Sequence, residues 1–564
     1  MDIILSSTEI WQLAVIKLLF YLFIFSGIFS FFYFRKPIIF VLLISGFLSS
    51  SYAVLVWHSQ LPWWGLQGDE VFVTAFLVKV ISGRFFSDFF HTNFPPFYPA
   101  LYYWLIGGIG YFLKISSIKT AQLGVAITLF LTPLIVYLVQ KYYSRFTPRQ
   151  LFAPWQAVLT TALVFIVYDW TAIILKPYEF FSAVLIVLWA VFLLNDFYFK
   201  NLNYKRLIIY GIFGGILFLF YYFWFLPVAL AILFFKIFSQ VDSKYFWPRI
   251  ILTGILILIV SLPFILPLLL SYLPNGSENW VPLFFIAEDL NLYLPFLSFS
   301  IFGFLTLVGL ISIIFYWRYP VFRALGFLLL AGYFWQFLNL ISLIFWQVSI
   351  LPGKPFLFLG GAILMIAAGF GLSQFILEKI PSDQNKKFLF ILGWIILATQ
   401  LLGGTFIDSP AVRHQLIEIK RPLREEFLNL IDELKKIESI ENLTILSSGI
   451  PQISAYLPLN YYISYNMHFS HPAANFIKRY EFLADLAIAK NADEFYQKFK
   501  NSPYEPINAL LFFKTENYYP MHFWLDYYPL GGVEQELKIP AHLISEQYFA
   551  KVFEDKYFVF YKTK

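Results

Sequence analysis

The stretch ALGFLLLAGYFWQFLNLISLIFWQVSILPG, residues 324–353, contains no Asp, Glu, Lys or Arg. As a helix, this stretch is long enough to cross about 30 Å of hydrocarbon. Four other stretches also lack these charged residues: 250–277, 293–317, 355–377 and 388–407. Their apolar character is continuous, whereas the strands of a membrane barrel alternate polar and apolar residues. The sequence therefore predicts an α-helical polytopic membrane protein.

The composition agrees with this class and excludes several others. Of 564 residues, 59% are hydrophobic and 13% are charged, and this charged fraction is far below that of soluble domains. The net charge of +6 comes from Lys and Arg in short loops, which is typical of cytoplasmic loops and not of nucleic-acid binding. Because the chain has no cysteine, disulfides, thiolate metal sites and a cysteine nucleophile are excluded.

The basic clusters predict the orientation, since Lys and Arg concentrate in cytoplasmic loops. The clusters are at 35–36, 141–149, 200–206, 236–249, 318–323 and 378–387. If all six clusters face the cytoplasm, the chain has about 12 spans and both termini lie outside. The first apolar segment has no basic residue before it and is too long for a signal peptide, so we expect it to be retained. The predicted spans are 10–33, 37–57, 119–140, 150–168, 177–197, 206–220, 222–238, 249–272, 293–317, 323–349, 355–378 and 387–406.

Two regions between these spans need separate interpretation. The segments 206–220 and 222–238 are individually short, so we expect a tight hairpin that bends near 221–227. Residues 58–118 form one long outer loop. Its apolar part, 97–113, is expected to lie along or dip into the outer leaflet with its Tyr and Trp residues at the interface.

The composition changes after Asp408, which indicates that the tail is a separate domain. Residues 1–407 form the predicted membrane domain, and 408–564 form a soluble mixed α/β domain outside the membrane. Residues 414–440 have a charged, amphipathic helical pattern, and 443–446 and 509–513 are typical of short strands. The last segment, 550–561, alternates in part like a closing strand or hairpin.

Two adjacent carboxylates, Asp69 and Glu70, stand early in the long outer loop. Acidic side chains at the mouth of a membrane protein are costly unless they are solvated or used. One interpretation is that the pair only caps the amphipathic stretch that follows it. The alternative is a catalytic role, which the long acidic, aromatic and proline-rich loop favours.

Several motifs of the chain together resemble a known family. An acidic residue early in the first large outer loop, followed by a Pro-Pro-aromatic-Tyr segment, is similar to membrane glycosyltransferases of the GT-C superfamily. More narrowly, the chain resembles the actinobacterial galactan arabinofuranosyltransferase family that primes galactan with its first arabinose. The motifs that carry this resemblance are Asp69-Glu70 with Phe72 and Phe76-Leu77, FPPFYP at 94–99, KPYE at 176–179, and SYNMHFSHPAA at 464–474.

The resemblance implies an inverting transfer of a sugar, arabinofuranose, from a polyprenyl-phosphate donor to a cell-envelope glycan. An outer carboxylate would remove the proton from the acceptor hydroxyl as it attacks the anomeric carbon. Asp69 is our candidate for this base, and Glu70 could instead hold a sugar; only the family pattern ranks the two. The resemblance also implies substrate-binding roles for His91, Asn93, Tyr98, Tyr178, Glu179, Asn466, His468 and His471.

Cations are needed where charge develops on the leaving lipid phosphate. Four candidates fit the predicted topology: Lys354, Lys176, Arg84 and Lys79. Lys354 is the most isolated, because it stands alone between two uncharged stretches. For each of the four, the alternative is a side chain that only reaches toward lipid headgroups.

No metal and no other cofactor is expected. His468 and His471 are three residues apart, but a third ligand at suitable spacing is missing. A transporter is the main rival class, although its expected paired halves and acidic groups inside spans are absent. A mannosyltransferase of the same superfamily and a noncatalytic scaffold are further alternatives. We expect an integral protein of the bacterial plasma membrane, with its active site and tail domain extracytoplasmic.

Overall fold

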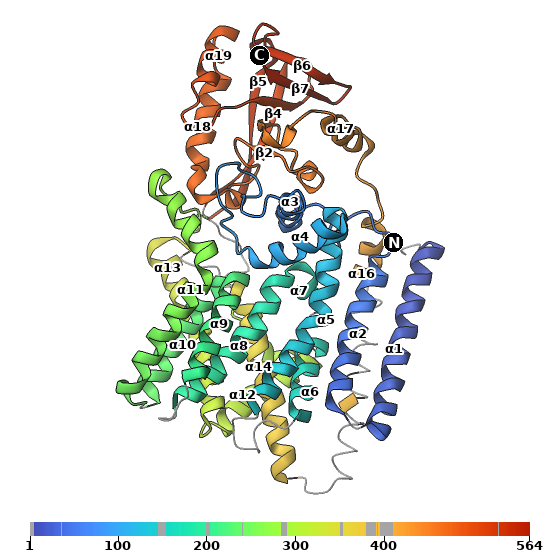
Figure 1. Cartoon of the computed structure of the whole chain (residues 1–564), viewed down its shortest axis with the longest axis vertical. Helices are drawn as coiled ribbons and strands as arrows, with labels where there is room; N and C mark the ends of the chain where they lie inside the picture. Colours follow the sequence, from blue (N-terminus) through green and yellow to red (C-terminus); the bar gives the residue numbers. More distant parts are fainter. Residues whose placement is uncertain are drawn as a thin grey trace.

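The computed structural model shows a bundle of apolar helices with a mixed α/β domain at one end (Figure 1). The start of helix α1 (Ser7–Tyr33) lies at the end of the bundle that faces this domain (Figure 1). The structure describes residues 5–34, 36–144, 154–167, 170–198, 204–239, 241–283, 290–349, 354–379, 391, 393–394, 397, 410–527 and 529–564.

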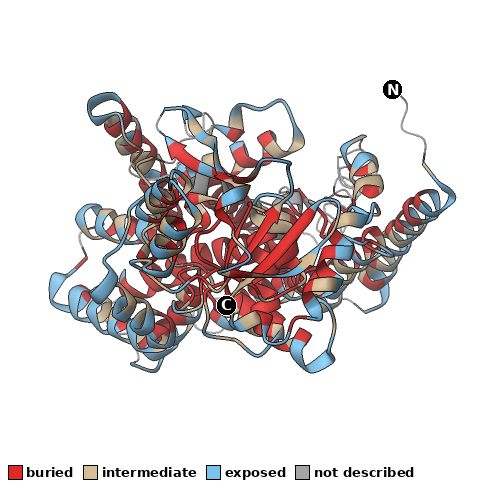
Figure 2. Cartoon of the chain, turned by 90° about the horizontal axis from the view of Figure 1, so that it is seen from above, coloured by how far each residue is buried: buried red, intermediate tan, exposed pale blue. Residues whose placement is uncertain are grey.

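Within these residues, seven helices are long and apolar enough to cross a membrane. The central helix is α8, whose residues are almost all buried, whereas the outer helices expose large apolar side chains toward the lipid region. Seen from the tail end, buried residues gather in the centre of the molecule (Figure 2). The seven are α1 (Ser7–Tyr33), α2 (Pro37–Leu55), α5 (Ser117–Ser144), α8 (Pro177–Tyr198), α11 (Ser243–Asn275), α13 (Pro320–Trp346) and the part Leu359–Ile376 of α14 (Lys354–Lys379).

Shorter helices occupy other predicted spans. The chain breaks at Tyr221 between α9 (Tyr204–Phe220) and α10 (Phe225–Phe238), which confirms the predicted interruption. Predicted span 150–168 contains α6 (Pro154–Ala162) and one π-helical segment, Leu163–Val167. The predicted span 387–406 lies mostly outside the described residues, so the number of 12 spans stays a prediction.

The predicted span 293–317 was wrong at its beginning. Helix α12 covers only Ile301–Phe315, and the residues before it form a 3₁₀ turn at Pro295–Leu297 and an irregular segment. Ser300 fixes the start, because its hydroxyl accepts a hydrogen bond from the Gly303 amide (3.0 Å). A side-chain cap of this kind satisfies an amide that the first helical turn leaves unpaired.

The predicted outer loop 58–118 contains two further helices, α3 (Asp69–Ile81) and α4 (Leu101–Leu113). In Figure 1, α4 crosses the ends of the long helices beneath the tail domain. The two helices pack closely because Gly107 has no side chain: a Cβ there would lie 2.6 Å from Val80 Cγ1. Phe112 at the end of α4 is largely exposed, which agrees with the expected contact between 97–113 and the membrane surface.

The tail is a mixed α/β domain, as predicted. Its five-stranded sheet has the order β2-β1-β3-β7-β6, in which β1 is parallel to β2 and β3, and β7 is antiparallel to β3 and β6. The predicted strands at 443–446 and 509–513 and the closing hairpin at 550–561 are confirmed. The strands are β1 (Thr444–Ser447), β2 (Asn460–Tyr461), β3 (Ala509–Phe513), β6 (Phe549–Glu554) and β7 (Phe558–Thr563).

A two-stranded sheet and four helices complete the tail. The sheet pairs β4 (Tyr518–Tyr527) with β5 (Gly531–Pro540) and was not predicted. The predicted helical region 414–440 contains two separate helices, α16 and α17. The helices are α16 (Pro410–Glu418), α17 (Glu425–Lys435), α18 (Phe476–Ala487) and α19 (Ala492–Lys500). The domain boundary at 407/408 falls outside the described residues.

Candidate active site

Helix α3 begins with the two adjacent carboxylates, and the residue before them sets its direction. Gly68 has a φ of +52°, a conformation that side-chain-bearing residues rarely adopt. Asp69 and Glu70 therefore form the first turn of α3, where the helix dipole favours negative charge. Behind them, Phe72 and Phe76 are fully buried, so the helix is anchored by its apolar residues.

Asp69 meets the KPYE motif at the beginning of α8. Lys176 Nζ lies 2.8 Å from Asp69 Oδ2 and 3.4 Å from Glu179 Oε1. The Tyr98 hydroxyl lies 3.3 Å from the Tyr178 hydroxyl and donates to Glu179 Oε1 (3.5 Å). We call these five residues the Asp69 cluster. The cluster brings together residues from the outer loop and from α8 that are far apart in the sequence.

The charges of the Asp69 cluster are partly accessible. The exposed side-chain fractions are 27% for Asp69, 17% for Lys176 and 5% for Glu179. Burial alone would lower the pKa of Lys176, but the carboxylates of Glu179 and Asp69 outweigh it and raise that pKa above its ordinary value. Lys176 is therefore a cation held by two carboxylates, of which Asp69 is the more accessible.

Glu70 differs from Asp69 although the two are neighbours. The residue is 6% exposed, and burial, together with the charge of Asp69, raises the pKa of Glu70 to about 8. At neutral pH it is therefore mostly protonated and faces the hydroxyls of Tyr52 and Tyr102. The adjacent acids thus have different environments, because Asp69 pairs with Lys176 and Glu70 is buried.

Two predicted phosphate-binding cations lie at the other end of α3, about 15 Å from Asp69 along the helix axis. Lys79 is 1% exposed and donates a hydrogen bond to Asn460 Oδ1 of the tail. Arg84 donates to the Glu441 carbonyl (2.5 Å) and to Asn442 Oδ1 (2.7 Å). Both cations thus contact the tail domain and not the Asp69 cluster.

Asp88 lies close to Lys79 and was not singled out from the sequence. It is fully buried, and its Oδ1 accepts hydrogen bonds from the amides of Phe90 and His91, both at 2.9 Å. Burial raises the pKa of Asp88 to about 7 and lowers the pKa of Lys79 to about 7. We call Lys79, Arg84, Asp88 and Asn460 the Lys79 cluster. An acidic residue within the aromatic run FSDFFHTNF was the sequence signal for Asp88.

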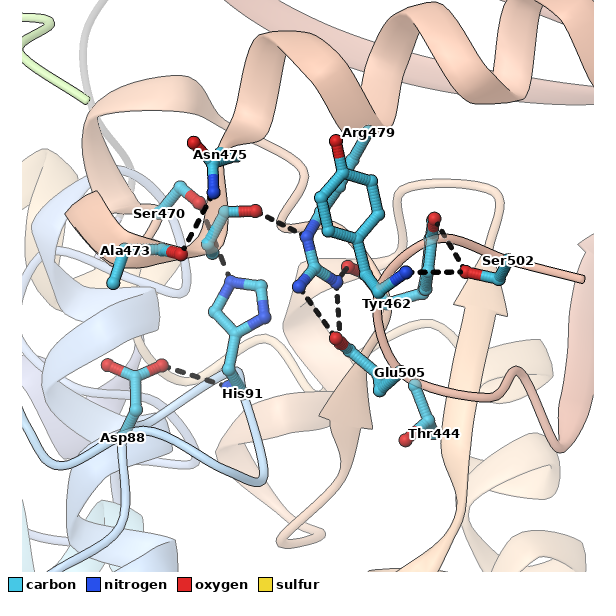
Figure 3. Close-up of polar contacts among 12 residues, drawn as sticks. Asp88, His91, Thr444, Tyr462, Ser470, Ala473, Asn475, Arg479, Ser502 and Glu505 are labelled. Carbon is cyan, nitrogen blue, oxygen red and sulfur yellow. Dashed lines mark hydrogen bonds and ion pairs between the residues drawn. The ribbon is translucent and has the colours of Figure 1, made fainter. Parts of the chain in front are cut away.

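His91 and His471 join the outer loop to the tail. His91 Nε2 lies 3.5 Å from the Ser470 hydroxyl, and the His471 ring stacks on Phe94 with centroids 4.6 Å apart (Figure 3 shows His91, Asp88 and Ser470). Burial lowers the pKa of His91 well below its ordinary value and that of His471 to about 3. Both rings are therefore neutral, and their contacts are with protein groups.

The remaining predicted residues are dispersed. Asn93 is exposed. The Asn466 side chain caps a 3₁₀ turn by accepting from the His468 amide (3.1 Å), and His468 Nδ1 lies 3.5 Å from Asp526 Oδ2. Lys354 is the first residue of α14, and its side chain lies outside the described part. Among the described residues, no group of three or more His, Cys, Asp or Glu side chains could hold a metal ion.

Comparison with solved structures defines the class of protein. The chain is similar to a crystal structure of ArnT from Cupriavidus metallidurans bound to undecaprenyl phosphate, with a TM-score of 0.52, 13% identity, and coverage of 93% of this chain and 97% of that chain. It is also similar to ArnT from the same organism in the apo state, with a TM-score of 0.49, 12% identity, and coverage of 91% and 97%. The fold of this chain is that of a GT-C membrane glycosyltransferase.

A family match narrows this class. The family described as "Arabinofuranosyltransferase N terminal" matches residues 5–388, more than half of the chain. The chain belongs to this family, and it is an integral membrane glycosyltransferase. The resemblance stated from the sequence motifs is thereby confirmed. No curated protein sequence matches the chain.

Proposed function

We propose that this enzyme transfers arabinofuranose from a polyprenyl-phosphate donor to a glycan acceptor of the bacterial cell envelope. The family supports arabinofuranose as the sugar, and the undecaprenyl phosphate in the ArnT structure supports a polyprenyl carrier. The observation that carries the proposal is the Asp69 cluster, where an accessible carboxylate lies 2.8 Å from an ammonium group at the tail-facing end of the bundle.

Asp69 is the general base of this reaction. It accepts the proton of the acceptor hydroxyl while that oxygen attacks the anomeric carbon from the face opposite the phosphate. The bond between the anomeric carbon and the phosphate oxygen breaks, the lipid phosphate leaves, and the configuration inverts. Glu70 is buried and has a pKa of about 8, so it is poorly suited to accept a proton at neutral pH.

Lys176 and Lys354 are proposed to have different roles. The ammonium group of Lys176 contacts the carboxylates of Asp69 and Glu179, so this cation is already engaged by protein groups. A carboxylate near the anomeric carbon favours the positive charge that develops there in the transition state. The lipid phosphate needs a further cation, which we propose to be Lys354, at the N-terminus of α14, where the helix dipole also favours an anion.

The Lys354 assignment has a direct test. Lys354→Ala should weaken donor binding and transfer, and Lys354→Arg should keep part of the activity, because either cation can meet a phosphate. Transfer rate measured against donor concentration distinguishes the cases. A side chain that only contacts lipid headgroups would give near-wild-type rates in both variants.

The reaction side is proposed to be extracytoplasmic. The basic loops support this orientation. Because the native chain has no cysteine, single cysteines report their location cleanly. An impermeant thiol reagent applied to intact cells should label Lys556→Cys in the tail but not Lys205→Cys in α9. Labelling of Lys205→Cys alone would reverse the orientation.

The reaction itself is tested with the purified full-length protein in nanodiscs. We expect consumption of polyprenyl-phosphate arabinofuranose and arabinosylation of a galactofuranosyl oligosaccharide, followed by mass spectrometry of both products. Polyprenyl-phosphate mannose is the control donor. Transfer of mannose with no transfer of arabinose would replace the proposed sugar, and transfer of neither would reject both.

A further inference from the structure

The two-stranded sheet β4–β5 has one buried face and one face that is exposed except at Pro520 and Asp526 (Figure 1 shows the place of the sheet in the tail). Residues that alternate along β4, including Met521, Phe523 and Leu525, are buried in the core of the tail. The intervening residues belong to the opposite face, since successive side chains of a strand point to opposite sides. This second face carries Tyr518, Pro520, His522, Trp524 and Asp526 from β4, and Gly532, Glu534, Glu536, Lys538 and Pro540 from β5.

Trp524 is the central residue of this face. It is the single tryptophan in the sequence after residue 409, and it is 43% exposed. Its ring rests against Gly532, where a Cβ would lie 3.3 Å from the Trp524 ring carbon Cε3. The Trp524 ring thus packs against the backbone of Gly532, and almost half of the surface of Trp524 stays exposed to solvent.

Polar groups surround the Trp524 ring. His522 Nδ1 lies 3.1 Å from Glu534 Oε1, and both side chains are partly exposed. On the other side, Asp526 is 2% exposed and pairs with His468. An aromatic surface bordered by carboxylate and imidazole groups offers stacking to the apolar face of a sugar ring and hydrogen-bond partners to its hydroxyls.

The charge of this face argues against a lipid surface as the occupant. Tryptophan is also common at membrane interfaces. However, the exposed side chains of the face include two carboxylates, those of Glu534 and Glu536, against one ammonium group, that of Lys538. An acidic face is repelled by anionic lipid headgroups and by anionic polymers. A neutral, polyhydroxylated chain meets no such repulsion.

The segment 465–469 links strand β4 to helix α3, which begins at Asp69. The Trp524 amide donates to the Tyr465 carbonyl (2.9 Å), and Asn466 forms a bridge with Trp524. The neighbouring Phe469 ring lies 5.2 Å from the ring of Phe72, which is one helical turn after Asp69. The segment 465–469 therefore contacts both the strand that carries Trp524 and the helix that carries the candidate base.

We propose that this β4–β5 face, centred on Trp524 with His522 and Glu534, is a binding surface for a neutral glycan chain, the acceptor. The inference rests on the proposed function. It adds a site that holds sugar units away from the reacting end. Long acceptors should therefore be used more efficiently than short ones, because only they reach Trp524.

Kinetics of the full-length protein in nanodiscs test this surface with linear galactofuranosyl oligosaccharides of two and of twelve units. Trp524→Ala should raise KM for the long acceptor about tenfold, consistent with the loss of an aromatic contact. The kcat, the KM for the donor and the KM for the short acceptor should stay within about twofold of wild type. Trp524→Phe should restore part of the effect. An equal KM change for both acceptors would overturn the proposal.

Matched controls separate stacking from folding and from lipid contact. Tyr557→Ala removes another exposed aromatic ring of the tail, 44% exposed, and should leave both KM values unchanged. Glu534→Gln keeps Trp524 and should raise KM for the long acceptor about threefold, so the proposal stays testable if Trp524→Ala fails to fold. A loss of vesicle association in Trp524→Ala, with unchanged acceptor kinetics, would assign the face to lipid and overturn the proposal.

A binding measurement without donor separates this inference from the proposed reaction. Saturation-transfer NMR should detect the twelve-unit oligosaccharide on the wild type and on Tyr557→Ala, and only weakly on Trp524→Ala. This result supports the surface even if no arabinose transfer is found. Equal signals in the three proteins, or no signal in the wild type, would overturn the proposal.

Discussion

The two ends of α3 carry similar residues in opposite settings. At the first end, Asp69 and Lys176 form a partly exposed ion pair. At the other end, Lys79 and Asp88 are buried, and Lys79 bonds to Asn460 of the tail. Exposed charges of opposite sign suit exchange with a substrate, whereas buried ones rigidly fix neighbouring elements. The N-terminal end of α3 thus carries the candidate catalytic acid, and its C-terminal end contacts the tail domain.

The largest expected effect is a difference in kcat between variants of Asp69 and Asp88, the acids at the two ends of α3. Asp69→Asn should lower kcat by about 10²-fold or more, the scale of a lost general base. Asp88→Asn should keep kcat near wild type, because its side-chain oxygen can still accept from the amides of Phe90 and His91. Steady-state kinetics in nanodiscs measure both. Equal losses in the two variants would remove the distinction between the ends of α3.

A stability measurement examines the docking end. Lys79→Met removes the donor to Asn460 Oδ1 and leaves a buried acceptor without its partner, which costs about 1–3 kcal/mol. The thermal midpoint of the purified protein should fall accordingly. The control is Lys556→Met on an exposed turn of the tail, which should have almost no effect. Similar midpoints for both variants would show that the Lys79 contact contributes little.

The last comparison concerns the neighbour of the candidate base. Glu70 has a pKa of about 8 in the folded protein and an ordinary value of 4.5, so only the unfolded chain ionises it between these values. Wild type should therefore lose stability relative to Glu70→Gln as the pH rises from about 4.5 to about 8, by up to about 1.4 kcal/mol per pH unit.

Thermal midpoints of both proteins across that pH range measure this difference. Asp69 and the hydroxyls of Tyr52 and Tyr102 are the ionisable groups that act on Glu70 or respond to it. At pH 7, Glu70→Gln should change kcat by less than about threefold, because the amide resembles the protonated acid. A stability difference independent of pH would mean that Glu70 is ionised in the folded protein.

Local patterns explain why much of the fold could be predicted. Most of the long helices could be predicted from apolar runs, because the length and continuity of such a run identify a membrane-spanning helix. The start of α12 could not be read from hydropathy, because Ser300 and a 3₁₀ turn set it. The β4–β5 hairpin had a signal in the alternation along 518–527 and in Gly531-Gly532.

The site was less accessible to sequence reasoning. The contact between Asp69 and the KPYE motif was not predicted, because the resemblance named both motifs without pairing them. The partners of Lys79 and Arg84 lie 381 and 357 or more positions away along the chain, and a single sequence carries no record of such pairs. For this reason, cations that resemble phosphate ligands by position turned out to contact the tail domain.

The bond between Lys79 and Asn460 also sets an order for biosynthesis. The outer loop emerges from the ribosome 381 residues before the tail strand that covers it. At usual rates of synthesis, this separation corresponds to roughly 20 to 80 seconds. During that time, the later membrane helices are still being synthesised and no tail domain covers α3. Maturation of the enzyme therefore includes a long-range contact between the outer loop and the tail domain, formed long after the outer loop is made.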